Sequence, residues 1–214
     1  MHRSIAIAGI HTGIGKTIAS AVLAEALHAD YWKPVQAGSL DNTDSIIVKD
    51  LIQDGAKRVH REAILLTAPK SPHAAAKEDN VEVDYTKFAW PHTDKLLLLE
   101  TAGGILSPMN DHATMADFIQ YFNLPTLLIS NNYLGSINHT LLSIELMKKR
   151  GIKILGLVMN GERNTSSEDF IEQYGAVPII ARIPFFETLN TETLKQCALE
   201  IRNSLLQKLN YEGN

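Results

Sequence analysis

A glycine-rich segment near the start of the chain carries the residues of a phosphate-binding loop. The segment from Gly9 to Thr17 reads GIHTGIGKT; it follows a short apolar run and precedes a helical pattern. Glycines allow the backbone to curl until its N–H groups converge on phosphate oxygens, and a helix N-terminus adds partial positive charge at the same point. Lys16 could reach the β- and γ-phosphates of ATP, and the Thr17 hydroxyl could bind Mg2+. The segment therefore predicts a Mg-ATP site.

The loop departs in one respect from the commonest form of this motif. Five residues separate Gly9 from the Gly15-Lys16 pair, where about four are usual. A purely structural turn is the alternative, but a Gly-Lys-Thr sequence at the first strand-to-helix turn favours phosphate binding.

Two carboxylates are candidates to complete the metal site, because Mg2+ prefers oxygen ligands and needs only one or two carboxylates from a protein. Glu100 closes the apolar run 96–99, where a strand would deliver it to the sheet edge, and the Gly103-Gly104 pair after it allows a close approach of the backbone. Asp44 precedes a helical run, so it could bind the metal or cap that helix. Both interpretations of Asp44 remain open.

Lys33 lies at the end of a weaker apolar run. An exposed surface lysine is the ordinary alternative for this residue type. Its predicted position, at the same sheet edge as the phosphate loop, makes Lys33 a candidate partner of the phosphates.

These residues must be positioned by alternating strands and helices. Apolar runs predict buried strands at 5–9, 95–100, 126–130 and 154–160, with weaker ones at 31–35 and 177–183. Helical spacing predicts helices near 18–27, 44–52, 115–122, 141–147, 167–174 and 192–209. Such alternation is typical of a doubly wound α/β fold with a mostly parallel sheet and helices on both faces, as in P-loop NTPases. No repeat or linker interrupts it, so we expect one domain over residues 1–214.

Composition excludes several classes of function. The formal net charge of -4 offers no basic surface for nucleic acid. Cys197 is the only cysteine, which excludes an internal disulfide and a site of several thiolates and is compatible with a reducing cytosol. No apolar run approaches the roughly 18 residues that span a bilayer, and the start of the chain predicts a core strand, not a signal peptide. We expect a cytoplasmic protein with no membrane or nucleic-acid partner.

Several motifs, in order, resemble one family, dethiobiotin synthetase. They are GIHTGIGKT from Gly9, KPVQAGS from Lys33, TDS from Thr43, SPH from Ser71, ETAGG from Glu100, LGSINH from Leu134, Asn160 and IPFFE from Ile183. The five-residue gap in the phosphate loop also looks like this family. The resemblance covers most of the chain. It implies that ATP, CO2 and 7,8-diaminononanoate give dethiobiotin, ADP and phosphate through a carbamate and a carbamic–phosphoric anhydride, with Mg2+ as cofactor.

The resemblance also implies residue roles. Lys16 and Lys33 would flank the carbamate and the γ-phosphate as catalytic groups, and Thr17, Asp44 and Glu100 would hold Mg2+ and ATP. The further residues implied for ATP binding are Gly13, Ile14, Gly15, Ile18, Gly103, Asn160, Gly161, Ile183, Pro184 and Glu187. Among them, Asn160 suits adenine because an amide both donates and accepts hydrogen bonds.

The residues implied for substrate binding are Thr12, Lys33, Ala37, Leu134, Gly135, Ser136 and Asn138. The segment 134–138 would meet the substrate carboxylate across the interface of a homodimer. Two positions depart from the family pattern: Ala37 stands where a hydroxyl residue is common, and Thr101 replaces the glycine usual after the metal glutamate. Neither departure removes a charged group.

Two alternatives stay open. A partitioning-type P-loop ATPase would carry a signature lysine early in the loop, where this chain has Ile10 to Gly13, and an amphipathic membrane tail, for which 205–214 looks too polar. An ATP-sensing module without catalysis is the other. No histidine pair has metal-ligand spacing, so we expect His73 and His139 to orient loops by hydrogen bonds.

Overall fold

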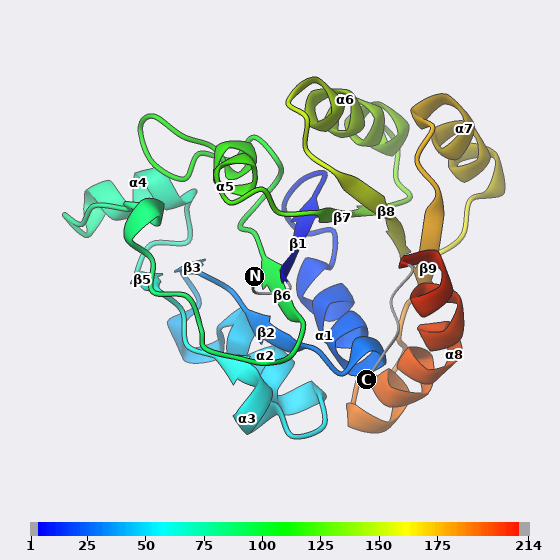
Figure 1. Cartoon of the computed structure of the whole chain (residues 1–214), viewed down its shortest axis with the longest axis horizontal. Coiled ribbons are helices and arrows are strands. Elements are labelled where there is room, and N and C mark those ends of the chain that lie inside the picture. Colours follow the sequence, from blue (N-terminus) through cyan, green and yellow to red (C-terminus); the bar gives the residue numbers. More distant parts are fainter. Residues whose placement is uncertain (1–3, 210–214) are drawn as a thin grey trace.

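The computed structural model describes residues 4–209 and has three layers, with a central sheet between two layers of helices (Figure 1). All strand pairings in the central sheet are parallel, and the strand order is β4-β2-β6-β1-β7-β8-β9. A small second sheet pairs β3 with β5, also in parallel. From β1 in the middle, the chain first builds one half of the sheet and then the other, so the predicted doubly wound α/β fold is confirmed.

The strands of the central sheet are β1 (Ser4–Gly9), β2 (Asp30–Trp32), β4 (Val59–His60), β6 (Leu97–Glu100), β7 (Thr126–Asn131), β8 (Ile154–Asn160) and β9 (Ile179–Ile183). Those of the small sheet are β3 (Val35–Ala37) and β5 (Ile64–Leu66). The α-helices are α1 (Lys16–Leu27), α2 (Asp44–Leu51), α3 (Gly55–Arg58), α4 (Pro72–Glu78), α5 (Met115–Tyr121), α6 (Ser136–Lys149), α7 (Thr165–Gly175) and α8 (Thr191–Leu209). Two short 3-10 turns, η1 (Leu40–Asn42) and η2 (Tyr85–Lys87), complete the described elements.

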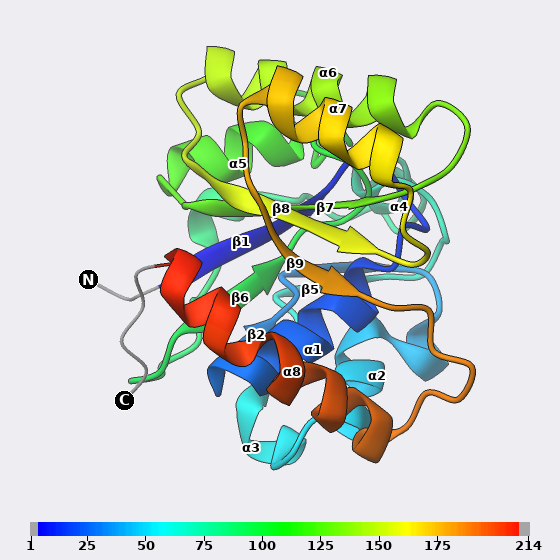
Figure 2. The same ribbon diagram turned by 90° about the vertical axis from the view of Figure 1, so that its right-hand side faces the viewer.

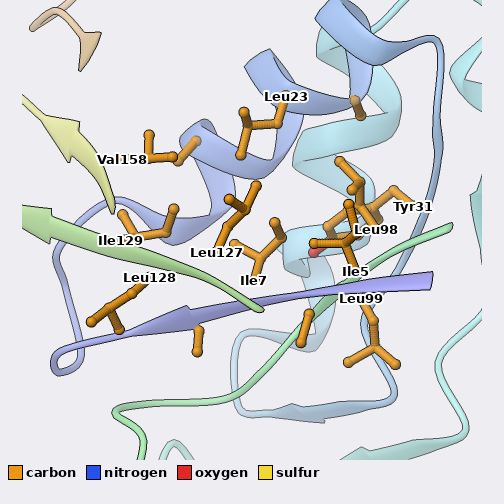
Figure 3. Close-up of a cluster of buried hydrophobic side chains, with 14 of the residues drawn as sticks. Ile5, Ile7, Leu23, Tyr31, Leu98, Leu99, Leu127, Leu128, Ile129 and Val158 are labelled. Atoms are coloured by element: carbon orange, nitrogen blue, oxygen red, sulfur yellow. The ribbon is translucent and has the colours of Figure 1, made fainter. Parts of the chain in front are cut away.

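The core lies on both faces of the central strands, which explains why their sequences are apolar without alternation. Figure 3 shows Leu127 and Ile129 of β7 on the side of the sheet that faces Leu23 of α1, with Leu128 on the opposite side. All four of these side chains are fully buried. Helices α1 and α8 pack together on one face, and α6 and α7 pack together on the other (Figure 2).

The predicted strand at 31–35 is wrong as a single element. The chain leaves the central sheet after Trp32 and enters the small sheet at Val35. Pro34 lies at this break; it has no N–H to donate and is disfavoured inside a central strand. Lys33, at the break, remains at the carboxyl end of β2 as predicted.

The other predicted strands and helices are present with small shifts at their ends, and β4, β5, α3 and α4 are additions that the sequence patterns did not predict. Within residues 4–209, no helix has the length and apolar character needed to cross a membrane. The prediction about a polar C-terminal tail extends to residues 210–214, which lie outside the described part of the chain.

Candidate active site

The phosphate loop connects the carboxyl end of β1 to the start of α1, at the point where the sheet order reverses between β6 and β7. In open α/β sheets, this switch point is where ligands bind. Gly13 and Gly15 have positive φ angles of 79° and 81°, which glycine adopts without strain. A Cβ atom at Gly15 would overlap the side-chain amide of Asn160. The loop therefore requires glycine at this position for a steric as well as a conformational reason.

Lys16 is buried beneath this loop, and its Nζ donates to the main-chain oxygen of His11 at 3.2 Å. Burial lowers the pKa of Lys16; the Glu100 and Asp44 carboxylates oppose this shift, and the Lys33 ammonium adds to it. An arriving phosphate would supply the negative charge that favours the ammonium form.

Four predicted residues from distant parts of the chain converge beside the loop. Lys33 Nζ forms an ion pair with Asp44 Oδ2 and lies 3.3 Å from Glu100 Oε1. The Thr17 hydroxyl donates to Asp44 Oδ1 and lies 3.3 Å from the same Glu100 oxygen. Tyr31 holds the other Glu100 oxygen with a hydrogen bond of 3.0 Å. The predicted metal ligands and Lys33 thus form one cluster, in which Lys33 and Glu100 are buried and Thr17 and Asp44 are half-buried, and Lys33 is not a surface lysine.

Contacts within the cluster shift the pKa values of Lys33 and Asp44 in the directions that favour their charged forms. Burial alone would lower the pKa of Lys33, but the Glu100 and Asp44 carboxylates raise it above its ordinary value. Burial alone would raise the pKa of Asp44, but Lys33, with the Thr17 hydroxyl and Lys16, lowers it. Burial and the Glu100 carboxylate raise the pKa of Tyr31 well above its ordinary value. In this arrangement the two carboxylates therefore favour the ammonium form of Lys33.

Asp44 does not cap α2, which settles one of the two open interpretations. Thr43 is the N-cap residue, and its hydroxyl accepts a hydrogen bond from the N–H of Ile46 at 3.2 Å. Asp44 is the first helical residue, so its carboxylate is available to Lys33 and Thr17.

The donor set fits Mg2+. One hydroxyl and two carboxylates, from Thr17, Asp44 and Glu100, bring oxygen atoms to one place. No group of three or more His, Cys, Asp or Glu side chains that could hold a metal ion occurs in residues 4–209. A set of one hydroxyl and two carboxylates suits Mg2+, which binds one or two carboxylates and fills its remaining positions with water and phosphate oxygens.

The segment after Glu100 passes against the phosphate loop. Gly103 has a φ angle of 64°, and a Cβ at Gly104 would come within 3.1 Å of the His11 Cα. Thr101, the departure from the family pattern, is buried, with its N–H and hydroxyl both directed to the main-chain oxygen of Ile7. The side chain is turned toward β1, so the extra bulk does not narrow the site.

The residues predicted to bind adenine lie at the carboxyl ends of β8 and β9. Asn160 Nδ2 donates to the main-chain oxygen of Ile14 at 2.8 Å, which ties the end of β8 to the phosphate loop. The Gly161 N–H donates to the Ile183 oxygen at 2.8 Å. The Ile183 side chain is fully buried, whereas Pro184 and Glu187 are exposed. A nucleotide base at this edge could thus contact the main chain at Gly161 and Ile183, and the exposed residues Pro184 and Glu187 follow Ile183 in the chain.

The predicted substrate residues fall into two groups. Thr12 is exposed beside the loop, and a Cβ at Gly103 would lie 3.5 Å from its hydroxyl oxygen. Leu134, Gly135 and Asn138 are exposed at the start of α6. Within residues 4–209, no hydrogen bond or ion pair joins the segment 134–138 to the Lys33 cluster.

Ser136 and Ala37 are less accessible than their predicted roles suggest. Ser136 is buried, its hydroxyl accepts from the N–H of Tyr133, and its own N–H donates to the Tyr133 oxygen. Ala37 lies in β3, half-buried and paired with Leu66.

A cavity of about 810 Å³ opens between the phosphate loop and α6. Its wall is mainly apolar and includes Ile10, Ile105, Leu106, Leu142 and Leu146. Thr12 lies on its rim of loop residues. The cavity can therefore receive a hydrocarbon chain whose polar end lies at the phosphate loop.

Two groups of residues near the site were not predicted as groups. The rings of His11, Tyr133 and His139 pack together, with centroids 5.2 to 6.1 Å apart, and the Tyr133 hydroxyl lies 2.6 Å from His139 Nδ1. His73 Nδ1 lies 2.9 Å from the Ser71 hydroxyl. His73 and His139 lie in the first turns of α4 and α6, and each hydrogen-bonds to a residue of the loop before its helix, which agrees with the prediction that they orient loops. The second group surrounds Glu168 and is described below.

Comparison with known proteins decides the family. A family model described as an AAA domain matches residues 3–193. The ATP-dependent dethiobiotin synthetase of Christiangramia forsetii is 42% identical over 210 residues, covering 97% of this chain and all of the relative. This chain belongs to the dethiobiotin synthetase family. The dethiobiotin synthetase of Cytophaga hutchinsonii is also 42% identical, covering 91% of this chain and 95% of the relative, and that of Paramagnetospirillum magneticum is 39% identical, covering 90% and 93%.

Two solved structures resemble this chain in fold. The MinC:MinD cell division complex of Aquifex aeolicus matches with a TM-score of 0.57 and 16% identity, covering 98% of this chain and 96% of the matched chain. A ParA family ATPase of Chlorobium tepidum matches with a TM-score of 0.53 and 17% identity, covering 98% and 95%. At such identities the likeness is one of fold alone, so the partitioning ATPases share the scaffold of this chain and carry no argument about its reaction.

Proposed function

We propose that this chain uses ATP and CO2 to close the ureido ring of dethiobiotin on 7,8-diaminononanoate, releasing ADP and phosphate. Its membership of the dethiobiotin synthetase family, at 42% identity over nearly the full length of a curated member, carries this proposal. The largely buried cluster of Lys33, Asp44, Glu100 and Thr17 beside the phosphate loop supports it, because phosphoryl transfer requires positioned cations and metal ligands.

The reaction needs no nucleophile from the protein. One amine of the diamine attacks CO2, loses a proton and becomes a carbamate. A carbamate oxygen then takes the γ-phosphoryl group of ATP, which forms the carbamic–phosphoric anhydride and releases ADP. The second amine attacks the carbonyl carbon, and phosphate leaves as the ring closes. The protein holds these groups in line and neutralises negative charge, which are the main sources of catalysis in phosphoryl transfer.

Lys16 and Lys33 are the proposed catalytic cations. Lys16 lies under the phosphate loop and would contact the β- and γ-phosphates. Before substrate binds, the neighbouring carboxylates raise the pKa of Lys33; with Mg2+ bound, the negative charge of the phosphates and the carbamate would favour the ammonium form, which would stabilise charge on the carbamate and the transferred phosphoryl group. A metal ion that takes up Asp44 and Glu100 would release Lys33 from its two ion-pair partners toward the substrate.

Thr17, Asp44 and Glu100 are the proposed Mg2+ ligands. Bound there, Mg2+ would neutralise charge on the phosphate oxygens of ATP. Tyr31 fixes the orientation of the Glu100 carboxylate from behind, through its hydrogen bond of 3.0 Å, as outer partners of metal ligands commonly do.

For the nucleotide, the proposed contacts beyond the phosphate loop are Asn160 and the main chain at Gly161 and Ile183. For the diamine, we propose that Thr12 and Lys33 hold the amine end. The apolar cavity beside Thr12 would take the methylene chain, since its wall of leucine and isoleucine matches a hydrocarbon.

The segment 134–138 would then serve a neighbouring subunit. Leu134 is fully exposed, and within residues 4–209 this segment makes no polar contact with the Lys33 cluster. We therefore propose a homodimer in which the start of α6 reaches the substrate carboxylate bound by its partner. Sedimentation velocity at micromolar concentration should give a dimer, and a fully active monomer would contradict this arrangement. We propose the cytoplasm, where ATP is available, as the compartment.

Labelled bicarbonate tests the function directly. The protein is incubated with 14C-bicarbonate, Mg-ATP and 7,8-diaminononanoate, and we expect acid-stable label in a ureido product together with stoichiometric ADP. An ATP-sensing module would release no ADP in response to the diamine and bicarbonate, and a partitioning-type ATPase would release ADP without incorporating label. Either result would overturn the proposal.

A further inference from the structure

A buried carboxylate outside the Lys33 cluster lies close to the proposed adenine site. Glu168 is in the first turn of α7, and only 1% of its surface is exposed. Burial of a carboxylate is costly unless it is paired and hydrogen-bonded. Since most of α7 lies at the protein surface, the buried Glu168 carboxylate must be stabilised by specific partners.

The Glu168 carboxylate joins three segments of the chain. Its Oε2 forms an ion pair with Arg182, the residue before the last of β9. Its Oε1 accepts from Asn132 Nδ2 at 2.7 Å, in the loop after β7, and from the Asn164 N–H at 3.2 Å, in the loop after β8. Asn132 Nδ2 also donates to the Glu162 main-chain oxygen at 2.8 Å. The loop 161–164 is thus held on one side by Asn132 and on the other by Glu168.

This loop follows directly on the groups assigned to the nucleotide. Asn160, the residue before it, contacts the phosphate loop through Ile14, and Gly161 binds the Ile183 main chain. Arg182 precedes Ile183 in β9. A single carboxylate therefore fixes both strand ends, β8 and β9, between which adenine is proposed to bind.

A second glutamate on the same helix makes a useful contrast. Glu172 lies one turn further along α7, and its carboxylate accepts from the Ile179 N–H at 2.7 Å. Ile179 begins β9 at the amino edge of the sheet, away from the phosphate loop. Glu172 therefore ties the same helix to the same strand, but at the end remote from the nucleotide.

We propose that Glu168 is a positioning residue for the nucleotide: it holds the loop 161–164 and the end of β9 so that Asn160 and the Ile183 main chain present a preformed base pocket. This inference rests on the proposed function for the assignment of that pocket. Glu168 touches no reacting atom, so it should affect nucleotide affinity and leave the chemical step nearly unchanged.

The matched variants are Glu168→Gln and Glu172→Gln. A glutamine side chain keeps the size but offers one acceptor oxygen where Glu168 serves donors at both, so one of its contacts is lost or reversed. For Glu168→Gln we expect the Kd of Mg-ADP from calorimetry and the KM for ATP to rise roughly tenfold. The KM for the diamine should stay within about twofold and kcat at saturating ATP within about threefold. Glu172→Gln should leave all four constants within about twofold of the wild type.

Thermal unfolding of each variant shows whether it is folded at the assay temperature. If Glu168→Gln is not folded, Asn132→Ala removes the same bracing from the other side and should raise the Kd of Mg-ADP severalfold. An unchanged Kd in a folded Glu168 variant, or in Asn132→Ala if Glu168→Gln does not fold, would overturn the proposal. An equal rise in Glu172→Gln would also overturn it, since the effect would then be loss of helix docking alone. Calorimetry with Mg-ADP does not depend on turnover, so failure of the wild type to make dethiobiotin would refute the proposed function separately.

Discussion

Replacing Lys33 by glutamine removes the only ammonium group that contacts Asp44 and Glu100 in the described structure, and its effect on stability can be estimated. Lys33 Nζ lies 3.3 Å from Glu100 Oε1, and the exposed fractions of the two side chains are 8% and 1%. At an effective dielectric constant of about 20, two unit charges at this separation attract by ~5 kcal/mol. Part of this is offset because the variant no longer buries a lysine. We expect a net loss of about 3 kcal/mol, at the lower end of the range for breaking a buried pair.

For a domain of this size, that loss lowers Tm by roughly 6–12 °C. Added Mg2+ should restore part of it and should stabilise the variant more than the wild type, because the two carboxylates no longer have a competing cation. Differential scanning fluorimetry with and without Mg2+ measures both effects.

The same variant tests the role of Lys33 in catalysis. Loss of one group that stabilises developing charge lowers kcat by about 10²–10³, while Lys16 and the loop amides still bind ATP, so the Kd of the nucleotide should stay within about threefold. Incorporation of 14C-bicarbonate gives kcat, and calorimetry gives the Kd. Lys70→Gln is the control, since Lys70 pairs with Glu78 at the surface and such pairs contribute little. Unchanged kcat in Lys33→Gln would refute the assignment, as would a parallel loss of ATP affinity.

Three further predictions concern the same site. Lys16→Ala should lower kcat/KM for ATP by at least about a hundredfold in the labelling assay, because the phosphates lose their main side-chain cation; near-normal rates would refute the loop assignment. Gly15→Ala should lower the free energy of unfolding by ~1–3 kcal/mol, measured in urea, since φ is 81° and the new Cβ overlaps Asn160; unaltered stability would mean that the loop can relax. Burial would raise the pKa of Asp44, but Lys33 lowers it below its ordinary value. The contribution of the Asp44 carboxylate to stability is therefore fully present above that ordinary pKa and is lost as the pH falls through the folded-state pKa. As the pH is lowered below ~4, the Tm of Asp44→Asn should therefore fall less than the Tm of the wild type. An equal fall in Tm for both proteins would show that the Asp44–Lys33 ion pair does not cause the acid sensitivity.

The fold could be predicted well where each helix or strand has a clear hydrophobic pattern in its own sequence. The apolar runs at β1, β6, β7 and β8 and the helical spacing around them were sufficient, because strands buried on both faces have few polar residues. The strands β4 and β5 have two and three residues, which is too few to show a repeating pattern of apolar residues. Pro34 lies at the break between β2 and β3, but the prediction of one strand over 31–35 took no account of it, and its effect depends on whether a second sheet is available to pair with the chain.

The candidate site was predicted as a list of residues, and the structure assembles part of that list. Lys33, Asp44 and Glu100 were each placed at a strand or helix end, and parallel strands bring such ends to a common edge. The contacts of Tyr31 with Glu100, and of Asn132 with Glu168, could not be predicted from the same patterns. They join side chains that are 69 and 36 positions apart. Local patterns of apolar residues do not indicate which buried polar groups come into contact.

The hydrogen bond between Asn160 and Ile14 has a consequence for how the protein is made. Its partners lie 146 positions apart, so a nascent chain emerging from the ribosome displays the phosphate loop, Lys16, Lys33, Asp44 and Glu100 long before the amide that braces the loop has been synthesised. We therefore expect the loop to reach its braced conformation only late in translation, once β8 has paired with β7. A truncated product that ends before β8 would carry Lys16, Lys33, Asp44 and Glu100 yet lack the Asn160 amide that hydrogen-bonds to the loop.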